Sequence, residues 1–499
     1  VASPSYFRRT ISGLALRDQY EVSRKLTLSA GLNFEVVTPR VEKYDRQSTV
    51  DLTLINPANG KPGALAVAAK NGQRRAFQPV RARLEPSLGI AWTPGIDSSM
   101  VVRMSYGLSY TTIPAYFGQW GTQGFNAYQT YISPNVQLAP AVVLADGLPS
   151  VGNLPDLRPD AVNDTVADLM DPTARQPVLQ NFTASVEREF AGSMVVTAGL
   201  KSYGGKNMLV GNSAANPNAI PIDALKYRDR LNDESFRRSL RPYPQYQSFD
   251  LNGLYPVARY ERNAGFLRVE KRTSGGLGLT ANYEFSKQMD DYSGPYGIQD
   301  FYNRENEWAM TAGSNPHRFS LSYVYELPMG RGRELFDFSD WRRYLVEGWS
   351  ISGMTTINSG DPLALYPQFN NTGTVLRTLN VDVVPGVDPH VADQGPDLWF
   401  NPAAFAQPED FTPGNASRTH PSLRNPSSRN HDLSLSKRFS LDAERTVELS
   451  AVGFNFINTA NWNDPDTEIG PASAPNANAG KIIGSRGGRV VQLGIRYSF

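Results

Sequence analysis

Hydrophobic and polar residues alternate along most of this chain, and this period of two restricts the fold more than any other feature of the sequence. In Lys25–Val36, Leu28 and Phe34 lie on one side of an extended strand, and Ser29 and Asn33 lie on the other. An amphipathic helix would repeat its apolar positions every three to four residues, and few segments do so. The pattern predicts an all-β protein.

About thirteen segments carry this alternation, and each is near or above the roughly 10 residues that a tilted strand needs to cross a bilayer. The predicted strands are Phe7–Tyr20, Lys25–Val36, Val80–Trp92, Val102–Tyr110, Pro177–Phe190, Ser193–Tyr203, Tyr260–Lys271, Gly276–Lys287, His317–Leu327, Val346–Ser359, Asn430–Phe439, Thr446–Asn458 and Arg489–Phe499. No stretch approaches the ~20 consecutive apolar residues of a membrane-spanning helix, which excludes an α-helical membrane protein.

The connections between these strands alternate strictly between short and long. The short ones lie near Glu21–Arg24, Pro94–Asp97, Ala191–Gly192, Thr273–Gly275 and Leu441–Glu444, with a moderate one at Pro328–Arg342. The long ones are Val37–Pro79, Ile113–Gln176, Gly204–Leu254, Met289–Pro316, Gly360–Ser428 and Thr459–Gly488. Such long loops count against a soluble sandwich, whereas outer-membrane barrels combine short periplasmic turns with long extracellular loops. We therefore expect a transmembrane antiparallel up-and-down β-barrel, although the alternation alone also suits a soluble barrel.

Charged residues inside the strands predict which face is turned away from lipid. An arginine on the lipid face near the bilayer midplane would cost roughly 2–4 kcal/mol. We expect six charged residues to face the lumen: Arg81, Arg83, Arg103, Glu284, Arg318 and Arg496. Such residues either contact another part of the protein within the lumen or form ion pairs between strands, and ion pairs are the default expectation.

Composition and motifs argue against several functions. Lys and Arg number 49 and Asp and Glu 48, so a net charge of +1 gives no basic field for nucleic acid. The chain has no Cys and only four His, which removes thiol chemistry and argues against a metal centre. Neither a G-x-S-x-G elbow nor a P-loop occurs. We expect no catalytic residue, cofactor or metal. The oxygens of Asn463–Glu468 could bind Ca²⁺, but the EF-hand pattern fails there, so we interpret this segment as a solvated acidic turn and Asp290–Asp291 similarly as ordinary loop residues.

The end of the chain and several internal segments resemble a known family. Leu493, Ile495, Tyr497 and Phe499 alternate up to a terminal aromatic residue, which resembles the β-signal read by the barrel-assembly machinery. Further segments resemble the OmpA-related (Oar-like) subgroup of TonB-dependent receptors: Phe266–Arg272, Tyr283–Asp291, Pro316–Pro328, Gly348–Gly353, Ser359–Pro362, Phe400–Phe405 and Phe454–Asn458. The resemblance covers the chain from about Gly13 to Phe499 and is strongest in the second half.

This resemblance implies a 22-stranded barrel that is plugged by an N-terminal domain, often preceded by a carboxypeptidase-regulatory-like domain. The plug moves when TonB pulls on a short N-terminal box. No segment here resembles the plug, that box or the regulatory-like domain, and the chain begins at Val1 without an initiator Met or signal peptide. We therefore expect residues 1–499 to be the C-terminal part of the barrel domain, with a smaller complete barrel as the alternative.

The resemblance also implies partners for the protein. They are the TonB complex, reached through a missing N-terminal region, the barrel-assembly machinery, the lipid bilayer with its lipopolysaccharide, and a surface lipoprotein or other envelope partner. The implied location is the outer membrane of a Gram-negative bacterium.

One long loop is rich in aromatic residues and is the candidate substrate site. Its aromatic residues are Tyr116, Phe117, Trp120, Phe125, Tyr128 and Tyr131. Among small polar residues, such side chains stack on sugar rings or hold peptide side chains. In the alternative interpretation, Tyr106, Tyr110 and Tyr116 form the outer aromatic girdle and the other residues pack the loop on itself.

The sequence thus predicts a TonB-dependent receptor that takes up a bulky substrate, a glycan, peptide or siderophore, without chemistry of its own. One alternative is a structural or adhesive barrel whose loops bind a surface or a protein partner. Another is a secreted, β-rich carbohydrate-active enzyme, which would be water-soluble and would carry a pair of catalytic carboxylates.

Deletion of Phe499 should impair assembly, because it removes the terminal aromatic residue of the expected β-signal. The measurement is the amount of heat-modifiable protein in the outer membrane, compared with total synthesis. A normal amount of the truncated protein in the membrane would contradict the assignment.

Overall fold

The computed structural model describes residues 4–95, 99–113, 118–126, 133, 140–148, 154–293, 297–442 and 444–499. Its main element is one antiparallel sheet, in which thirteen strands follow each other in chain order. They are β2 (Ile11–Ser23), β3 (Leu26–Val37), β7 (Arg81–Trp92), β8 (Met100–Tyr110), β10 (Val178–Phe190), β11 (Met194–Val210), β13 (Tyr255–Ser274), β14 (Leu277–Asp290), β16 (His317–Glu326), β17 (Trp349–Asn358), β21 (Ser428–Ser440), β22 (Thr446–Phe454) and β26 (Val490–Ser498). The predicted all-β architecture and its thirteen strands are confirmed.

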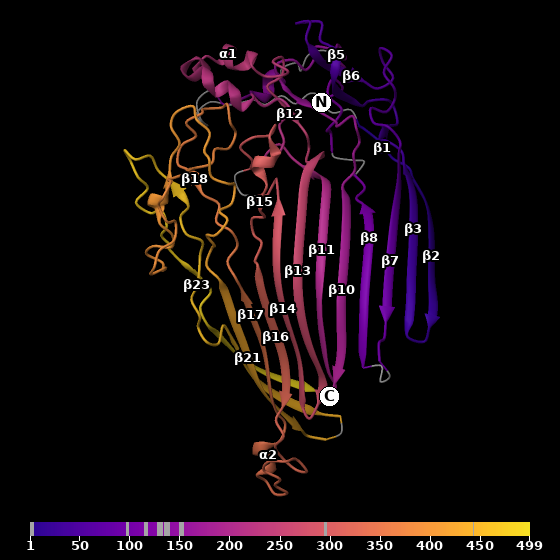
Figure 1. Cartoon of the computed structure of the whole chain (residues 1–499), viewed down its shortest axis with the longest axis vertical. Coiled ribbons are helices and arrows are strands. Elements are labelled where there is room, and N and C mark those ends of the chain that lie inside the picture. The colour runs from indigo at the N-terminus through magenta and orange to yellow at the C-terminus, as the bar shows by residue number, and fades with distance from the viewer. Residues whose placement is uncertain are drawn as a thin grey trace.

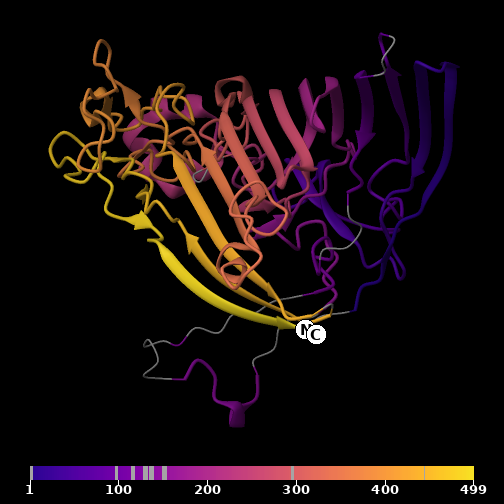
Figure 2. The same ribbon diagram turned by 90° about the horizontal axis from the view of Figure 1, so that it is seen from below.

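The sheet bends into a wide arc (Figure 2). Each strand pairs with the next one along the chain, and the short β15 (Ala309–Met310) adds a fourteenth strand beside β14. Within the described residues, β2 at one end of the arc pairs only with β3, and β26 at the other end pairs only with β22. The arc therefore has two edges whose backbone groups face away from the sheet.

Several strand boundaries differ from the sequence prediction; for example, β11 ends at Val210 rather than Tyr203, and β22 ends at Phe454 rather than Asn458. The first strand begins at Ile11 rather than Phe7, because Phe7 and Arg8 instead form β1, which pairs with β4 (Val41–Glu42). Strand β13 extends upward to Tyr255, five residues beyond the expected start. Its added part pairs with the upper end of β11, where the hydrophobic alternation no longer marks a strand.

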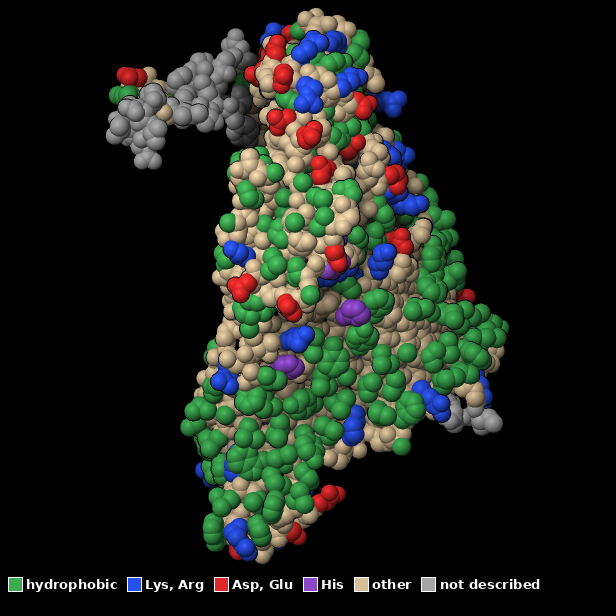
Figure 3. All heavy atoms as spheres, turned by 60° about the vertical axis from the view of Figure 1, so that its left-hand side comes forward, with side chains coloured by type: hydrophobic (Ala, Val, Ile, Leu, Met, Phe, Trp, Pro, Cys, Tyr) green, Lys and Arg blue, Asp and Glu red, His purple; other side chains and the backbone are tan. Residues whose placement is uncertain are grey.

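The two faces of the sheet differ in chemistry. By register, directly paired residues share a face, and this places the exposed apolar side chains together. Examples are Leu14, Leu16, Leu88, Met104, Phe182, Leu200, Leu267, Phe285, Leu493 and Ile495. Figure 3 shows the resulting apolar surface on the lower half of the molecule. Asp18 of β2 also lies on this face, between Leu16 and Tyr20.

Long connections gather at one end of the sheet and short turns at the other (Figure 1). The long connections contain the small strands β5 (Ser48–Ile55), β6 (Pro62–Val67), β9 (Val166–Asp168), β12 (Ser248–Asp250), β18 (Tyr366–Pro367), β19 (Asp382–Val383), β20 (Phe405–Ala406), β23 (Asn461–Trp462), β24 (Glu468–Ile469) and β25 (Ser485–Arg486). Their helices are α1 (Glu234–Ser239), η1 (Leu144–Asp146), η2 (Ile222–Asn232), η3 (Arg304–Glu307) and η4 (Pro402–Ala404), while α2 (Arg343–Val346) lies in a turn. No described helix has the length and apolarity needed to span a membrane.

The described parts of most long connections pack together into a cap, which we define as residues 38–80, 111–113, 118–126, 154–177, 211–254, 291–293, 297–316, 359–427 and 455–489. Three apolar clusters form its interior, and their central buried side chains include Tyr246, Phe249, Phe400 and Leu231. The loops approach so closely that a Cβ on Gly414 would lie 1.9 Å from the carbonyl oxygen of Asn380. Only glycine fits there, so the loops form a packed layer rather than independent strands of coil.

The two faces of the sheet generate a direct prediction. Ala281 lies midway along β14 and pairs with Val269 and Leu321, so Ala281→Arg puts a charge on the apolar face. We expect it to lower the free energy of unfolding in lipid vesicles by about 2–4 kcal/mol. Urea titration of the vesicle-inserted protein measures this change.

The matched control is Ser320→Arg on β16, whose neighbours Asn282 and Thr356 share the polar face. It should leave the free energy of unfolding nearly unchanged. Equal losses for the two variants would contradict the assignment of the faces.

Candidate functional site

The polar face of the sheet lines an open cavity of about 920 Å³. Residues from strands as distant as β10 and β22 line it, so it lies on the concave side of the arc. Its polar lining includes Glu187, Glu270, Thr280, Ser322, Ser352, Asp432 and Ser434. Hydroxyl and carboxylate groups give this cavity a surface that water wets.

The six charged residues expected to face the lumen all lie on this polar face by register. Three of them form ion pairs with neighbouring strands. Arg83 contacts Glu35 at 2.5 Å, Arg103 contacts Glu187 at 3.2 Å, and Glu284 pairs with Arg262 and, at 3.8 Å, with Lys201. Most of these pairs tie adjacent strands of the wall together, and the Lys201–Glu284 pair reaches from β11 across β13 to β14.

The other three residues bind neutral partners or lie beside a charged one. Arg81 donates to the carbonyl oxygen of Thr173, and Arg318 donates to Asn315 at 3.3 Å. Arg496 lies directly opposite Glu448 in the β22–β26 register. The charges on this face are thus distributed along the whole arc.

Two of the six aromatic residues proposed for substrate binding lie within the described part of the chain. Trp120 is 8% exposed, and its indole nitrogen donates to the carbonyl oxygen of Asp250 at 3.0 Å. Phe125 packs against the largest apolar cluster of the cap. Both side chains therefore hold the cap together, which is the alternative interpretation of this loop. Tyr116, Phe117, Tyr128 and Tyr131 lie outside the described residues.

The buried side chain of Arg40 packs against Trp120, and Asp168 lies nearby. The guanidinium of Arg40 lies 4.2 Å from the ring centroid of Phe7 and 5.0 Å from that of Trp120. Burial lowers the pKa of Arg40 to about 10 and raises the pKa of the nearby Asp168 carboxyl to about 7. Asp168 also accepts a hydrogen bond of 2.6 Å from the backbone N–H of Gly121. The aromatic loop is thus fixed by charge as well as by packing.

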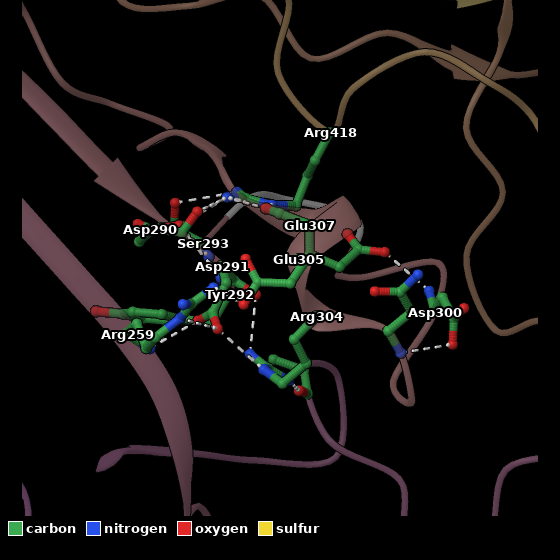
Figure 4. A network of polar contacts seen from close by, with 12 residues as sticks. Arg259, Asp290, Asp291, Tyr292, Ser293, Asp300, Arg304, Glu305, Glu307 and Arg418 are labelled. Atoms are coloured by element: carbon green, nitrogen blue, oxygen red, sulfur yellow. Dashed lines mark hydrogen bonds and ion pairs between the residues drawn. The ribbon is translucent and has the colours of Figure 1, made fainter. Parts of the chain in front are cut away.

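A second network of charges joins three connections of the cap (Figure 4). Arg418, from the β17–β21 connection, donates to a carboxylate oxygen of Asp290 at 2.7 Å and to its carbonyl oxygen at 2.8 Å. It also donates to Ser293 at 3.2 Å and to the carbonyl oxygen of Glu307. The Arg418 and Asp290 side chains are only 4% and 0% exposed. Burial lowers the pKa of Arg418.

The neighbouring carboxylate extends this network to the barrel wall. Asp291 accepts from the backbone N–H of Arg259 on β13 at 2.8 Å and from the guanidinium of Arg304 at 3.1 Å. Arg304 reaches further to the carbonyl oxygen of Ala214 in the β11–β13 connection at 2.7 Å. Glu307 accepts two backbone N–H groups, and burial raises its pKa. The network therefore fixes three loops above the rims of β13 and β14.

The last strand carries three of the four residues of the expected β-signal, and the fourth, Phe499, directly follows it. Leu493, Ile495, Tyr497 and Phe499 point to the apolar side and are exposed, and the rings of Tyr497 and Phe499 stack at 5.6 Å. Their neighbours on β22 lie on the same apolar face. This arrangement matches the apolar outer surface that a membrane-inserted edge strand needs.

A comparison with protein families matches residues 2–492 to the outer membrane beta barrel domain. The chain belongs to this family. Its location is accordingly the outer membrane of a Gram-negative bacterium, and the apolar face of the barrel wall is its lipid-facing surface. The comparison with curated proteins gives no match.

Several solved structures are similar to the chain at low sequence identity. The siderophore receptor PiuA from Acinetobacter baumannii is 10% identical over 99% of this chain, with a TM-score of 0.43. The FrpB iron transporter from Neisseria meningitidis is 11% identical over 100%, with a TM-score of 0.43. The ferric yersiniabactin receptor FyuA from Yersinia pestis is 10% identical over 99%, with a TM-score of 0.40. The barrel chain covers 43%, 47% and 46% of these proteins, respectively.

Sequence reasoning missed the Asp290–Arg418 network of this barrel. The interpretation of Asp290–Asp291 as ordinary loop residues is wrong, because both side chains are fully buried and charge-paired. Asp290 and Arg418 are 128 positions apart, and no local sequence pattern predicts their contact. A doublet of acids directly at the end of a strand was the only available signal. No group of metal-binding side chains occurs among the described residues.

Replacement of Arg418 tests the network. Arg418→Met leaves the Asp290 carboxylate buried without its cation, which should cost about 3–5 kcal/mol of local stability. Hydrogen exchange of residues 297–316 measures the opening of this part of the cap. The expected result is much faster exchange there, with little change in the strands.

Two further variants check this prediction. Adding Asp290→Asn to Arg418→Met should restore much of the protection, because it removes the uncompensated charge. Arg158→Met, which breaks the exposed ion pair with Asp156, should have little effect. Independent, additive effects of Arg418→Met and Asp290→Asn would argue against a coupled pair.

Proposed function

We propose that this chain forms the C-terminal wall of a TonB-dependent receptor, which takes up a bulky substrate across the outer membrane. The observation that carries the proposal is the open arc with its polar concave face. Membership of the outer membrane beta barrel family makes the two free edges of this arc significant. A bilayer supplies no hydrogen bonds to the edge backbone of β2 and β26.

The size of the arc supports a large barrel. Thirteen consecutive strands do not bring β26 back to β2, so closure needs more strands between them. Bacterial barrels formed by one chain have even strand numbers, and barrels of 22 strands have a plugged lumen. We propose that strands, a plug and a TonB-binding segment encoded outside this chain complete the receptor. Segments such as Pro316–Pro328 resemble those of Oar-like receptors and support this assignment.

The wall offers both surfaces that such a receptor needs. Its lumen face carries distributed ion pairs and a wetted cavity, against which a polar plug can rest and then move. Its cap covers the outer mouth with packed loops, and these include the part of the aromatic loop that holds Trp120 and Phe125. The substrate is proposed to be a glycan, a peptide or a siderophore, bound by cap and lumen without bond-making chemistry. The barrel-assembly machinery and lipopolysaccharide are its proposed envelope partners.

The test compares three strains of the source bacterium: wild type, a deletion of this gene and a deletion of tonB. Growth is measured on single sources of iron, glycan or peptide. The proposal expects at least one source on which both deletions fail and on which the gene restored in trans rescues growth only when TonB is present.

The opposite pattern would favour the alternative barrel functions. A defect that appears in the gene deletion and is unaffected by loss of TonB indicates a passive or adhesive barrel. Loss of surface attachment without any nutrient defect would point to adhesion in particular.

A further inference from the structure

The connection between β16 and β17 differs from every other described turn at its end of the sheet. Residues 327–348, which we call the foot, hold α2 and project below the lower ends of the strands (Figure 1). The other turns at this end span only residues 24–25, 93–99, 191–193, 275–276 and 441–445. At the periplasmic end of an outer-membrane barrel, short turns are the rule. The foot therefore needs an explanation of its own.

A lysine fixes the foot to the lipid-facing side of the wall. Lys437 pairs in register with Trp349 and Leu449, so it lies on the apolar face of the sheet. Its ammonium donates to the carbonyl oxygens of Leu345 at 3.1 Å and Glu347 at 2.7 Å. The same ammonium lies 4.8 Å from the ring centroid of Trp349 and 4.9 Å from that of Phe439. The C-terminal half of the foot is thus attached below the lipid-facing surface.

The foot exposes an unusual number of large apolar side chains. They are Leu335, Phe336, Trp341, Tyr344 and Leu345, and Trp341 and Leu345 are 69% and 60% exposed. Figure 3 shows hydrophobic side chains continuing from the strands to the lowest part of the molecule, which is where Figure 1 places α2. A contiguous apolar surface of this kind marks contact with a membrane or a protein.

The charges of the foot indicate which of these it contacts. Among its carboxylates, Asp337, Asp340 and Glu347 each accept a backbone N–H of the foot itself. Arg343 is partly exposed, and it donates to the hydroxyl of Tyr344. Arginine beside Trp and Tyr is the composition found at the boundary between headgroups and acyl chains.

We propose that the foot lies in the headgroup region of the periplasmic leaflet and anchors the barrel wall there. Trp341, Tyr344 and Leu345 enter the boundary with the acyl chains, and Arg343 binds lipid phosphates. The surface is continuous with the lipid-facing wall through Lys437 and Trp349, so the bilayer that covers the wall also covers the foot. This inference rests on the outer-membrane location and holds whether or not the barrel transports a substrate.

Single introduced cysteines test the contact, because the chain contains no native Cys. Trp341→Cys and Leu345→Cys are labelled with an environment-sensitive fluorophore in the intact protein purified from outer membranes. The labelled protein is placed in phosphatidylethanolamine–phosphatidylglycerol vesicles that carry nitroxide lipids, with the nitroxide at the headgroup or at the bilayer centre. Heat-modifiable migration on gels confirms that each variant is folded.

Two positions serve as references. Leu493→Cys lies on the lipid-facing wall and is 78% exposed, whereas Ile483→Cys lies in the cap and is 92% exposed. Both foot labels should shift to shorter emission wavelengths and lose most of their fluorescence to the headgroup nitroxide, with weaker loss to the central one. The Ile483→Cys label should be quenched by neither.

Two results would overturn the proposal. If the foot labels have the same emission wavelength and quenching as the Ile483→Cys label, the foot is exposed to water. A shift to shorter wavelengths without quenching by either lipid would show that a protein surface, from a plug or a second barrel, covers it instead.

Discussion

Lipid offers the backbone no hydrogen bonds, and this constraint governs the rest of the structure. Each of the thirteen strands forms backbone hydrogen bonds with its neighbours in chain order. An unpaired segment would carry N–H and C=O groups without hydrogen bonds into the bilayer. Side chains then have two environments, the lipid on one face and the wetted concave side on the other. The alternation of apolar and polar residues follows directly from this division. The same constraint makes the free edges of β2 and β26 the feature from which the proposed larger barrel is argued.

Above the membrane, water can hydrogen-bond to the backbone, so a different requirement applies. Loops there become ordered only when they bury enough surface to offset the lost conformational entropy. The cap solves this with three apolar clusters and with charges that are removed from water together with their partners. Asp290 and Arg418 illustrate the energetic cost and the structural benefit of burying a charged pair. Breaking such a pair is strongly destabilising, although an apolar replacement of the whole pair need not be. Its structural effect is to hold distant connections in one arrangement over the lumen.

Individual residues show how far the sequence predicted the molecule. Arg103 and Glu284 were placed on the polar face from the cost of charge in lipid, and the register puts them there. Trp120 carried no such signal, since an aromatic residue in a loop serves ligand binding and packing equally well. Its burial depends on Asp250 and Arg40, which are far away in sequence. Asp290 was misread for the same reason.

The foot is a second feature that the sequence predicted only in part. Its length was visible in the sequence as a moderate connection, but its attachment depends on Lys437, which comes from another strand pair.

By itself, the sequence determined the all-β class, the thirteen strands, their up-and-down order and the face to which most strand residues point. These properties repeat every two residues or alternate along the chain, so local patterns record them. Only the tertiary structure decided how the loops pack, which charges meet and where the foot lies. The decisive contacts join distant residues, such as Arg40 and Trp120, 80 positions apart, or Asp290 and Arg418, 128 positions apart. Their energy depends on burial, which no single stretch of sequence specifies.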